Sequence, residues 1–141
     1  MKILIDASAI VKTVLDERGS DEALRIWLGA DAAYASRLAY PEARSALARA
    51  GRGGRIDPRE VNGLTANLDR TWRQVVVVEL TERVARMAGD IAERHGLRAG
   101  DAVHLASALV LEDREVTLAT WDRRLATAAS AAGVPVTPPL S

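Results

Sequence analysis

The sequence of 141 residues contains no cysteine and no phenylalanine, and only Lys2 and Lys12 among its basic residues are lysines. Without cysteine, the chain cannot form disulfide frameworks, zinc-thiolate sites or thiol nucleophiles. The 19 basic residues balance the 19 acidic residues, so the formal net charge is zero. This balance excludes a uniformly basic protein that coats nucleic acid. It leaves open a nucleic acid held by a local basic patch and by metal ions.

Long apolar runs are also missing. No run reaches the length of about 20 residues that a membrane span needs. The apolar start at Ile3–Ile5 is too short for a signal-peptide core, because Asp6 interrupts it. We therefore expect a cytoplasmic protein that does not enter a membrane.

The length and composition indicate one globular domain spanning residues 1–141, since domains usually hold about 100–200 residues. Apolar residues make up 48% of the chain and charged residues 27%, which excludes wholesale disorder.

Short apolar segments alternate with amphipathic ones along the chain. We expect strands over 3–5, 32–36, 75–78 and 116–120, with a further edge strand over 134–136. We expect helices over 7–15, 21–28, 40–50, 58–72, 81–95, 101–112 and 122–132. The run Val75–Val78 is apolar on both faces, which is typical of a buried strand. The alternation predicts an α/β fold with a mostly parallel central sheet of four to five strands, flanked by helices on both faces.

Four acidic residues are expected at the carboxyl end of this sheet, where open α/β sheets bind their ligands. Asp6 directly follows the first strand, and Asp122 follows the fourth, two residues after Thr120. Glu42 lies within a turn of the helix after the second strand, and Asp101 follows the loop that ends at residue 100.

A simpler interpretation is that each aspartate only caps a helix. Asp6, Asp101 and Asp122 each precede an expected helix, and Asp is a favoured N-cap residue worth about 1 kcal/mol. Four carboxylates at one sheet edge repel one another, however, and Ser or Thr could cap without that cost. Clustered carboxylates without Cys or paired His suit a hard divalent cation such as Mg²⁺ or Mn²⁺.

Three segments resemble the PIN-domain ribonucleases. The opening ILIDASA at 3–9 is similar to the family's apolar strand followed by D-x-S, and LRAGDAVHLASA at 97–108 is similar to its third-acid segment. TWDRRL at 120–125 resembles its T-x-D segment, and Glu42 falls where the second acid is expected. The resemblance covers the whole chain in order and spacing, and the length is similar to the VapC-type toxin branch.

The resemblance implies a single PIN-like domain with Mg²⁺- or Mn²⁺-dependent endoribonuclease activity. It implies a catalytic acidic site made of Asp6, Glu42, Asp101 and Asp122, with the metal on Asp6, Asp101 and Asp122, and with Ser8 and Thr120 as polar supports. It also implies a homodimer that is inhibited by a cognate VapB-type antitoxin. Some relatives carry a further acid beside the fourth, where this chain has Ala119 and Trp121, so the number of metal ions stays open.

The segment from Tyr40 to about Trp72 reads as an arginine-rich helical hairpin, which is either a solvated surface or a binding surface. We expect Arg37 and Arg44 to contact RNA phosphates, and an antitoxin helix to fill an apolar groove that includes Leu64 and Leu68. Trp121 either stacks on an RNA base or packs in the core. His104 is interpreted as a packed helix residue rather than a ligand.

Two other functions compete with the ribonuclease. A catalytically silent PIN-like scaffold could bind RNA or a protein partner, and a metal-dependent cleavage assay distinguishes it. A doubly wound phosphotransfer module is the other alternative. A phosphatase would favour D-x-D where position 8 is Ser, and a receiver would need a lysine near the last strand, which this chain lacks.

Overall fold

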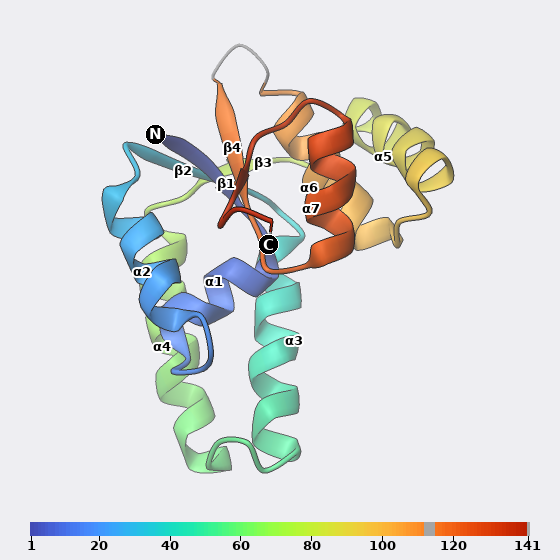
Figure 1. Cartoon of the computed structure of the whole chain (residues 1–141). Helices are drawn as coiled ribbons and strands as arrows, with labels where there is room; N and C mark the ends of the chain where they lie inside the picture. The colour runs from blue at the N-terminus through green and yellow to red at the C-terminus, as the bar shows by residue number, and fades with distance from the viewer. Residues whose placement is uncertain (112–114, 141) are drawn as a thin grey trace.

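The computed structural model describes residues 1–111 and 115–140. Its strands are β1 (Lys2–Ile5), β2 (Ala32–Ser36), β3 (Val76–Val78), β4 (Val116–Ala119) and β5 (Val136–Thr137). Its α-helices are α1 (Ala7–Val14), α2 (Ser20–Gly29), α3 (Ala39–Arg52), α4 (Val61–Trp72), α5 (Glu82–His95), α6 (Ala99–Leu109) and α7 (Arg123–Ala131), and a short 3₁₀ helix, η1 (Pro58–Glu60), precedes α4 (Figure 1).

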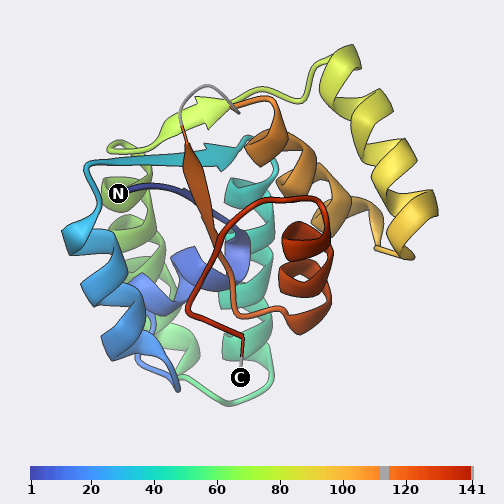
Figure 2. The ribbon, with the colours of Figure 1, turned by 45° about the horizontal axis from the view of Figure 1, so that its top comes forward.

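The strands form one parallel sheet in the order β3-β2-β1-β4-β5. This arrangement confirms the predicted α/β fold class, with five strands at the upper end of the expected number. Helices cover both faces of the sheet, with α1 to α4 on one side and α5 to α7 on the other (Figure 2).

The core lies in two layers, one on each face of the sheet. Along β1, Leu4 packs with α5, α6 and α7, whereas Ile3 and Ile5 pack with α1, α3 and α4. This follows from the period of two in a strand, which sends alternate side chains to opposite faces. All three side chains are almost completely buried, so the run Ile3–Ile5 is apolar because both faces of the central strand are covered.

Several expected elements differ in their bounds. The strand expected over Val75–Val78 is confirmed as β3 over Val76–Val78, which pairs with β2 at the edge of the sheet and leaves Val76 54% exposed. Its β-branched composition indicates a strand without fixing its place in the sheet. The edge strand expected over 134–136 lies at Val136–Thr137 as β5. The helix expected to begin at Asp101 begins at Ala99, and the expected end at Glu112 lies outside the described residues.

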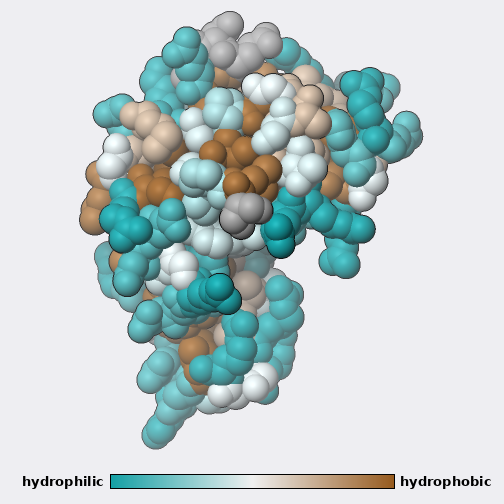
Figure 3. Space-filling view, viewed as in Figure 1, coloured by the Kyte–Doolittle hydropathy of each residue, from teal (hydrophilic) through white to brown (hydrophobic). Residues whose placement is uncertain are grey.

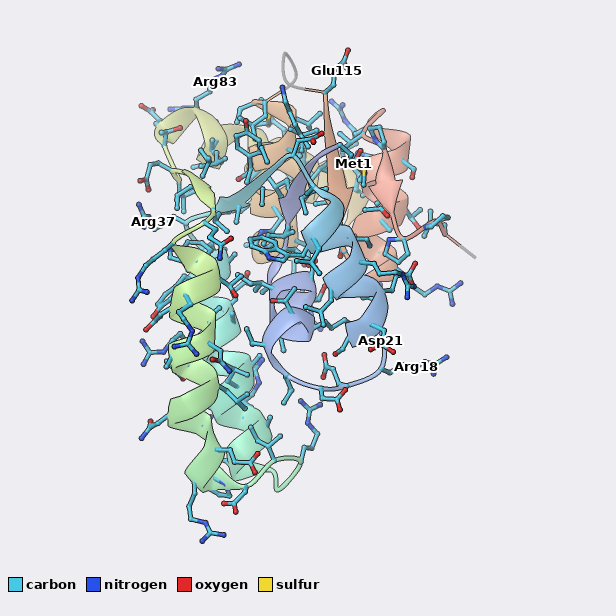
Figure 4. The ribbon with its side chains drawn as sticks, turned by 90° about the vertical axis from the view of Figure 1, so that its left-hand side faces the viewer. Met1, Arg18, Asp21, Arg37, Arg83 and Glu115 are labelled. Carbon is cyan, nitrogen blue, oxygen red and sulfur yellow. The ribbon has the colours of Figure 1, made fainter. Side chains whose placement is uncertain are left out.

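Helices α3 and α4 form a hairpin that projects from the rest of the molecule (Figures 1 and 4). The face of the hairpin seen in Figure 3 is mainly hydrophilic. Its apolar residues point inward: Leu47 and Leu68 are completely buried, and Leu64 packs against the same core. Leu68 is therefore not accessible to a partner helix, whereas Leu64 is only partly buried, and the expected antitoxin groove on the hairpin stays a prediction. No helix in the described ranges is long and apolar enough to cross a membrane.

Candidate active site

The candidate site lies where the order of strands reverses. The chain moves from β1 outward to β2 and β3, and then returns to place β4 on the other side of β1. Such a switch point, at the carboxyl ends of the strands, is where open α/β sheets bind ligands. Ile5 pairs with Ala119 in register, so Asp6 and Thr120 leave the sheet side by side.

Asp6 is held rigidly at this point by three hydrogen bonds. Asp6 as a whole is 3% exposed. Oδ1 accepts from the Ser8 hydroxyl at 2.7 Å and from the Ala9 backbone N–H at 2.9 Å, and Oδ2 accepts from the Thr120 hydroxyl. Asp6 therefore caps α1, as the simpler interpretation expected, and it also presents a fixed negative charge at the switch point.

Ser8 and Thr120 tie Asp6 to the loop after β4. The Thr120 hydroxyl accepts from the Asp122 backbone N–H at 3.0 Å, and the Ser8 hydroxyl accepts from the Trp121 backbone N–H at 3.2 Å. Asp122 caps α7, because its Oδ1 accepts from the Leu125 backbone N–H at 2.9 Å. One network of hydroxyls thus fixes two of the four acids.

Glu42 reaches the site from the first turn of α3 and contacts α6. Its Oε1 lies 2.6 Å from Nε2 of His104, and a Cβ placed on Gly100 would lie 2.8 Å from its Oε2. Only glycine allows the carboxylate to approach the start of α6 so closely. His104, interpreted from the sequence as a packing residue, is indeed buried at 2% exposure, but it also holds an acid of the site. Sequence reasoning missed this contact because the two residues are 62 positions apart.

Asp101 differs from the other aspartates because it caps nothing. The N-cap position of α6 belongs to Arg98, and Asp101 lies in the first turn of the helix. Burial raises the pKa of Asp101, and the charges of Asp122, Asp6 and Glu42 raise it further, while His104 opposes them. The capping interpretation therefore fails at Asp101, because Asp101 is not the N-cap residue of α6. In addition, its surroundings disfavour its ionised form. The same coupling shows that the four acids share one electrostatic environment.

The environment of His104 is polarised by the same acids. Burial would lower the pKa of His104, but the hydrogen bond to Glu42 and the charges of Asp6, Glu42 and Asp101 outweigh it and raise the pKa. Its Nδ1 is buried and has no hydrogen-bond partner in the described part of the chain. In the described part of the chain, Nε2 is therefore the one ring nitrogen of His104 with a hydrogen-bond partner, and that partner is Glu42.

A pocket of about 1030 Å³ opens beside the acids, between α1 and α3. Ser8, Glu42 and Asp122 line one part of it, and three basic residues, Lys12, Arg49 and Arg55, also line it. The sequence analysis placed Arg49 and Arg55 in the arginine-rich segment but did not single them out, and it missed Lys12. A signal for Lys12 existed, because positions 8 and 12 are four apart and share one face of a helix.

Arg37, Arg44 and Trp121, which were expected to bind substrate, do not line this pocket in the described part of the chain. Arg37 makes a two-point ion pair with Glu79 on the outer side of the molecule, away from the α1–α2 loop that carries Arg18 (Figure 4). The Arg44 guanidinium lies 5.7 Å from the ring centre of Tyr40 and donates to its hydroxyl. Trp121 packs against the core beside α1. Their roles toward a substrate stay predictions.

The chemistry of the donor set fits a hard divalent cation. Asp6, Glu42, Asp101 and Asp122 offer carboxylate oxygens, which Mg²⁺ and Mn²⁺ prefer, and a nearby positive charge would favour the ionised form of Asp101. Within residues 1–111 and 115–140, no three Asp, Glu or His side chains already form a metal-binding group. The carboxylates would therefore have to draw together around an ion.

Comparison with known proteins gives a consistent result. The family model described as "PIN domain" matches residues 3–131. The chain is 47% identical over 136 residues to ribonuclease VapC45 of Mycobacterium tuberculosis, covering 96% of this chain and 94% of that protein.

Solved structures share the fold at low sequence identity. PAE2754 from Pyrobaculum aerophilum matches with a TM-score of 0.71 and 22% identity, covering 96% of this chain and 83% of the other. A toxin–antitoxin complex from Klebsiella pneumoniae contains a chain that matches with a TM-score of 0.66 and 16% identity, covering 99% and 98%.

Proposed function

The chain belongs to the PIN domain family, and from this premise we propose that it is an endoribonuclease toxin that hydrolyses RNA phosphodiester bonds. The observation that carries the proposal is Asp101. Asp101 does not occupy the N-cap of α6, and burial, followed by the charges of Asp122, Asp6 and Glu42, raises its pKa. Placing four acids near one another costs electrostatic free energy, and Asp101 makes no cap that would offset this cost. Acids with shifted pKa values in such surroundings are typical of a functional site.

We propose that Asp6, Asp101 and Asp122 hold Mg²⁺ or Mn²⁺, with Glu42 completing the acidic site. When bound, the ion supplies Lewis-acid activation of a water and neutralises charge on the phosphate. Ser8 and Thr120 keep the Asp6 carboxylate oriented, and His104 does the same for Glu42.

The pocket between α1 and α3 suits an extended polyanion that ends at Glu42 and Asp122, the two acids of the site that line it. Lys12, Arg49 and Arg55 place positive charge along it, and phosphate groups are the usual partners of such side chains in nucleic-acid recognition. The full name of the relative VapC45 includes the word ribonuclease, which supports RNA as the substrate class.

The proposal includes two partners. We propose a VapB-type antitoxin, supported by the VapC relative and by the solved toxin–antitoxin complex with the same fold. Its acidic groups would compete with RNA for the basic wall of the pocket. We also propose that the chain forms a homodimer, as the family resemblance implies.

The experiment that tests the function is a digest of total RNA by the purified protein, with the cleavage ends mapped. Endoribonuclease activity predicts new internal ends at defined positions, and these ends should be absent with Asp101→Asn. A silent scaffold would instead bind RNA and leave it intact. Equal cleavage by the wild type and Asp101→Asn would indicate a contaminating nuclease and contradict the assignment.

A further inference from the structure

Lys12 lines the pocket between α1 and α3, and among the three basic residues there its surroundings point to a specific contact rather than to a general positive charge. It is one of two lysines in the chain and projects from α1, four residues after Ser8. Its side chain is 15% exposed, which is low for a lysine, and it lines the same pocket as Ser8, Glu42 and Asp122. Because positions four apart share a helix face, Lys12 lies one turn along α1 from the network around Asp6.

Three segments of the chain hold this ammonium in place. Nζ donates to Oε1 of Glu17 at 2.9 Å and lies 5.7 Å from the ring centre of Trp121. Gly19, at φ +91°, lets these groups close together: a Cβ there would meet Nε1 of Trp121 at 2.8 Å and the Lys12 side chain at 3.3 Å. The helix, the α1–α2 loop and the loop after β4 therefore all contribute to the position of one positive charge.

The ammonium keeps unused hydrogen-bonding capacity. A lysine ammonium has three donors, and in the described part of the chain Lys12 makes one hydrogen bond, to Glu17. The remaining donors belong to a group that lines an open pocket. A side chain that is both constrained and incompletely bonded is prepared for a ligand, since little of its freedom remains to be lost on binding.

We propose that Lys12 is a substrate-binding residue, whose ammonium contacts a phosphate of the RNA strand that the acidic site cleaves. This inference rests on the proposed function, because it assigns the polyanion in the pocket to RNA. An ammonium is a compact point charge that binds phosphate without selecting a base. Lys12 would thus hold the strand beside the acids, where four carboxylates would otherwise repel it.

The test measures binding of a short single-stranded RNA by fluorescence anisotropy at several salt concentrations, in the non-cleaving Asp101→Asn background. Each phosphate contact adds about 0.7 to the slope of log affinity against log salt for single strands. Lys12→Met should lower that slope by about 0.7, which corresponds to roughly fivefold weaker binding at 0.1 M salt. Lys12→Arg should restore the slope.

Two matched variants separate phosphate binding from a merely structural ion pair. Glu17→Gln breaks the same ion pair but keeps the ammonium, so the salt slope should be retained. Lys2→Met removes the other lysine, which is exposed at the start of β1, and should change neither slope nor stability. If Lys12→Met keeps the full slope, or if Glu17→Gln loses it equally, Lys12 is structural and the inference is wrong.

The outcomes also distinguish this inference from the proposed function. Wild-type protein that neither cleaves nor binds RNA would overturn the proposed function, and this inference with it. Wild-type protein that cleaves RNA while Lys12→Met binds with an unchanged slope would overturn this inference alone. If Lys12→Met weakens antitoxin binding but leaves RNA binding unchanged, Lys12 makes a protein contact, and this inference is contradicted as well.

Discussion

Nε2 of His104 lies 2.6 Å from Oε1 of Glu42, and this contact joins α6 to α3 across 62 residues of sequence. His104 is buried, whereas Glu42 reaches into the pocket beside Ser8 and Asp122. In the proposed function, the imidazole acts on the site through the carboxylate that it orients. His104 would then be a positioning residue for Glu42.

Removing the imidazole should lower the RNA cleavage rate strongly while the protein stays folded. His104→Leu leaves Glu42 without its partner, and loss of such positioning contacts typically costs about 10–100-fold in activity. His104→Gln keeps an amide donor and should retain more activity than His104→Leu. The measurement is the RNA cleavage rate at saturating Mn²⁺, together with the Mn²⁺ concentration that gives half the maximal rate.

Ser107→Ala is the matched control, because it removes a buried hydroxyl of α6 that, within the described ranges, bonds to the Val103 carbonyl and to no group of the site. It should leave both cleavage measurements unchanged. If His104→Leu and Ser107→Ala affect cleavage equally, the contact with Glu42 has no special role.

Asp101→Asn and Asp6→Asn should both abolish cleavage but differ in stability. Without divalent cations, Asp101→Asn should raise the free energy of unfolding, because it removes a charge that burial and three neighbouring acids disfavour. Asp6→Asn should not raise the free energy of unfolding. The Asp6 carboxylate accepts hydrogen bonds from Ser8, Ala9 and Thr120 through both oxygens, whereas an amide can accept through only one oxygen. Urea unfolding in chelator checks the order, and equal stabilisation by both variants would contradict it.

The stability of the metal-free protein should rise as the pH falls through the folded pKa of His104, which lies above the ordinary value of 6.5, and on toward the ordinary Asp value of 3.8. Folding raises the pKa of Asp101 and of His104, so the folded state binds more protons than the unfolded state over this range. Stability contributed by these groups is lost again as the pH rises through their folded pKa values. Below about pH 4 the trend should reverse, as groups with lowered pKa values become protonated; these are Asp31, Asp57 and Glu79.

Urea unfolding across this pH range in chelator provides the measurement. Asp101→Asn should flatten the slope, and added Mn²⁺ should do the same in the wild type because a bound cation favours the ionised carboxylate. A slope that is identical in the wild type and in Asp101→Asn would show that Asp101 does not carry the effect.

Gly100→Ala should weaken cleavage by displacing Glu42. A Cβ at position 100 would lie 2.8 Å from Oε2 of Glu42, so the carboxylate must shift away from the start of α6. Gly89→Ala in α5 is the control, because a Cβ there meets nothing within 4 Å and should add up to about 1 kcal/mol of stability through helix propensity. Cleavage rates and thermal unfolding of both variants distinguish a local effect on Glu42 from a general one.

The sequence was sufficient to predict the elements that follow from local patterns. Asp6 could be placed because it directly follows β1, and Asp122 because it follows β4 after two residues, and parallel strands bring their carboxyl ends to one edge. The position of β3 could not, because four consecutive valines indicate a strand whether it lies at the centre or at the edge. Sheet order depends on long-range packing that no local pattern encodes.

The contacts that complete the site were less accessible from the sequence. The pairing of His104 with Glu42 needs the crossing of α3 and α6, and Lys12 depends on Gly19 and Trp121 from two other segments. Arg37 and Arg44 were favoured as RNA contacts because they flank Glu42 in sequence. In the structure they face Glu79 and Tyr40 instead. Arg37 lies in the turn before α3, and Arg44 leaves α3 in a direction different from that of Glu42.

The central claim is that the four acids form one divalent-cation site that cleaves RNA. Cleavage of a defined RNA by the purified wild-type protein, first in excess chelator and then with Mn²⁺ or Mg²⁺ restored, tests it most directly. We predict no cleavage in chelator, recovery on addition of either ion, and no recovery with Asp101→Asn. Cleavage that persists undiminished in excess chelator, or recovery in Asp101→Asn equal to that of the wild type, would contradict the account.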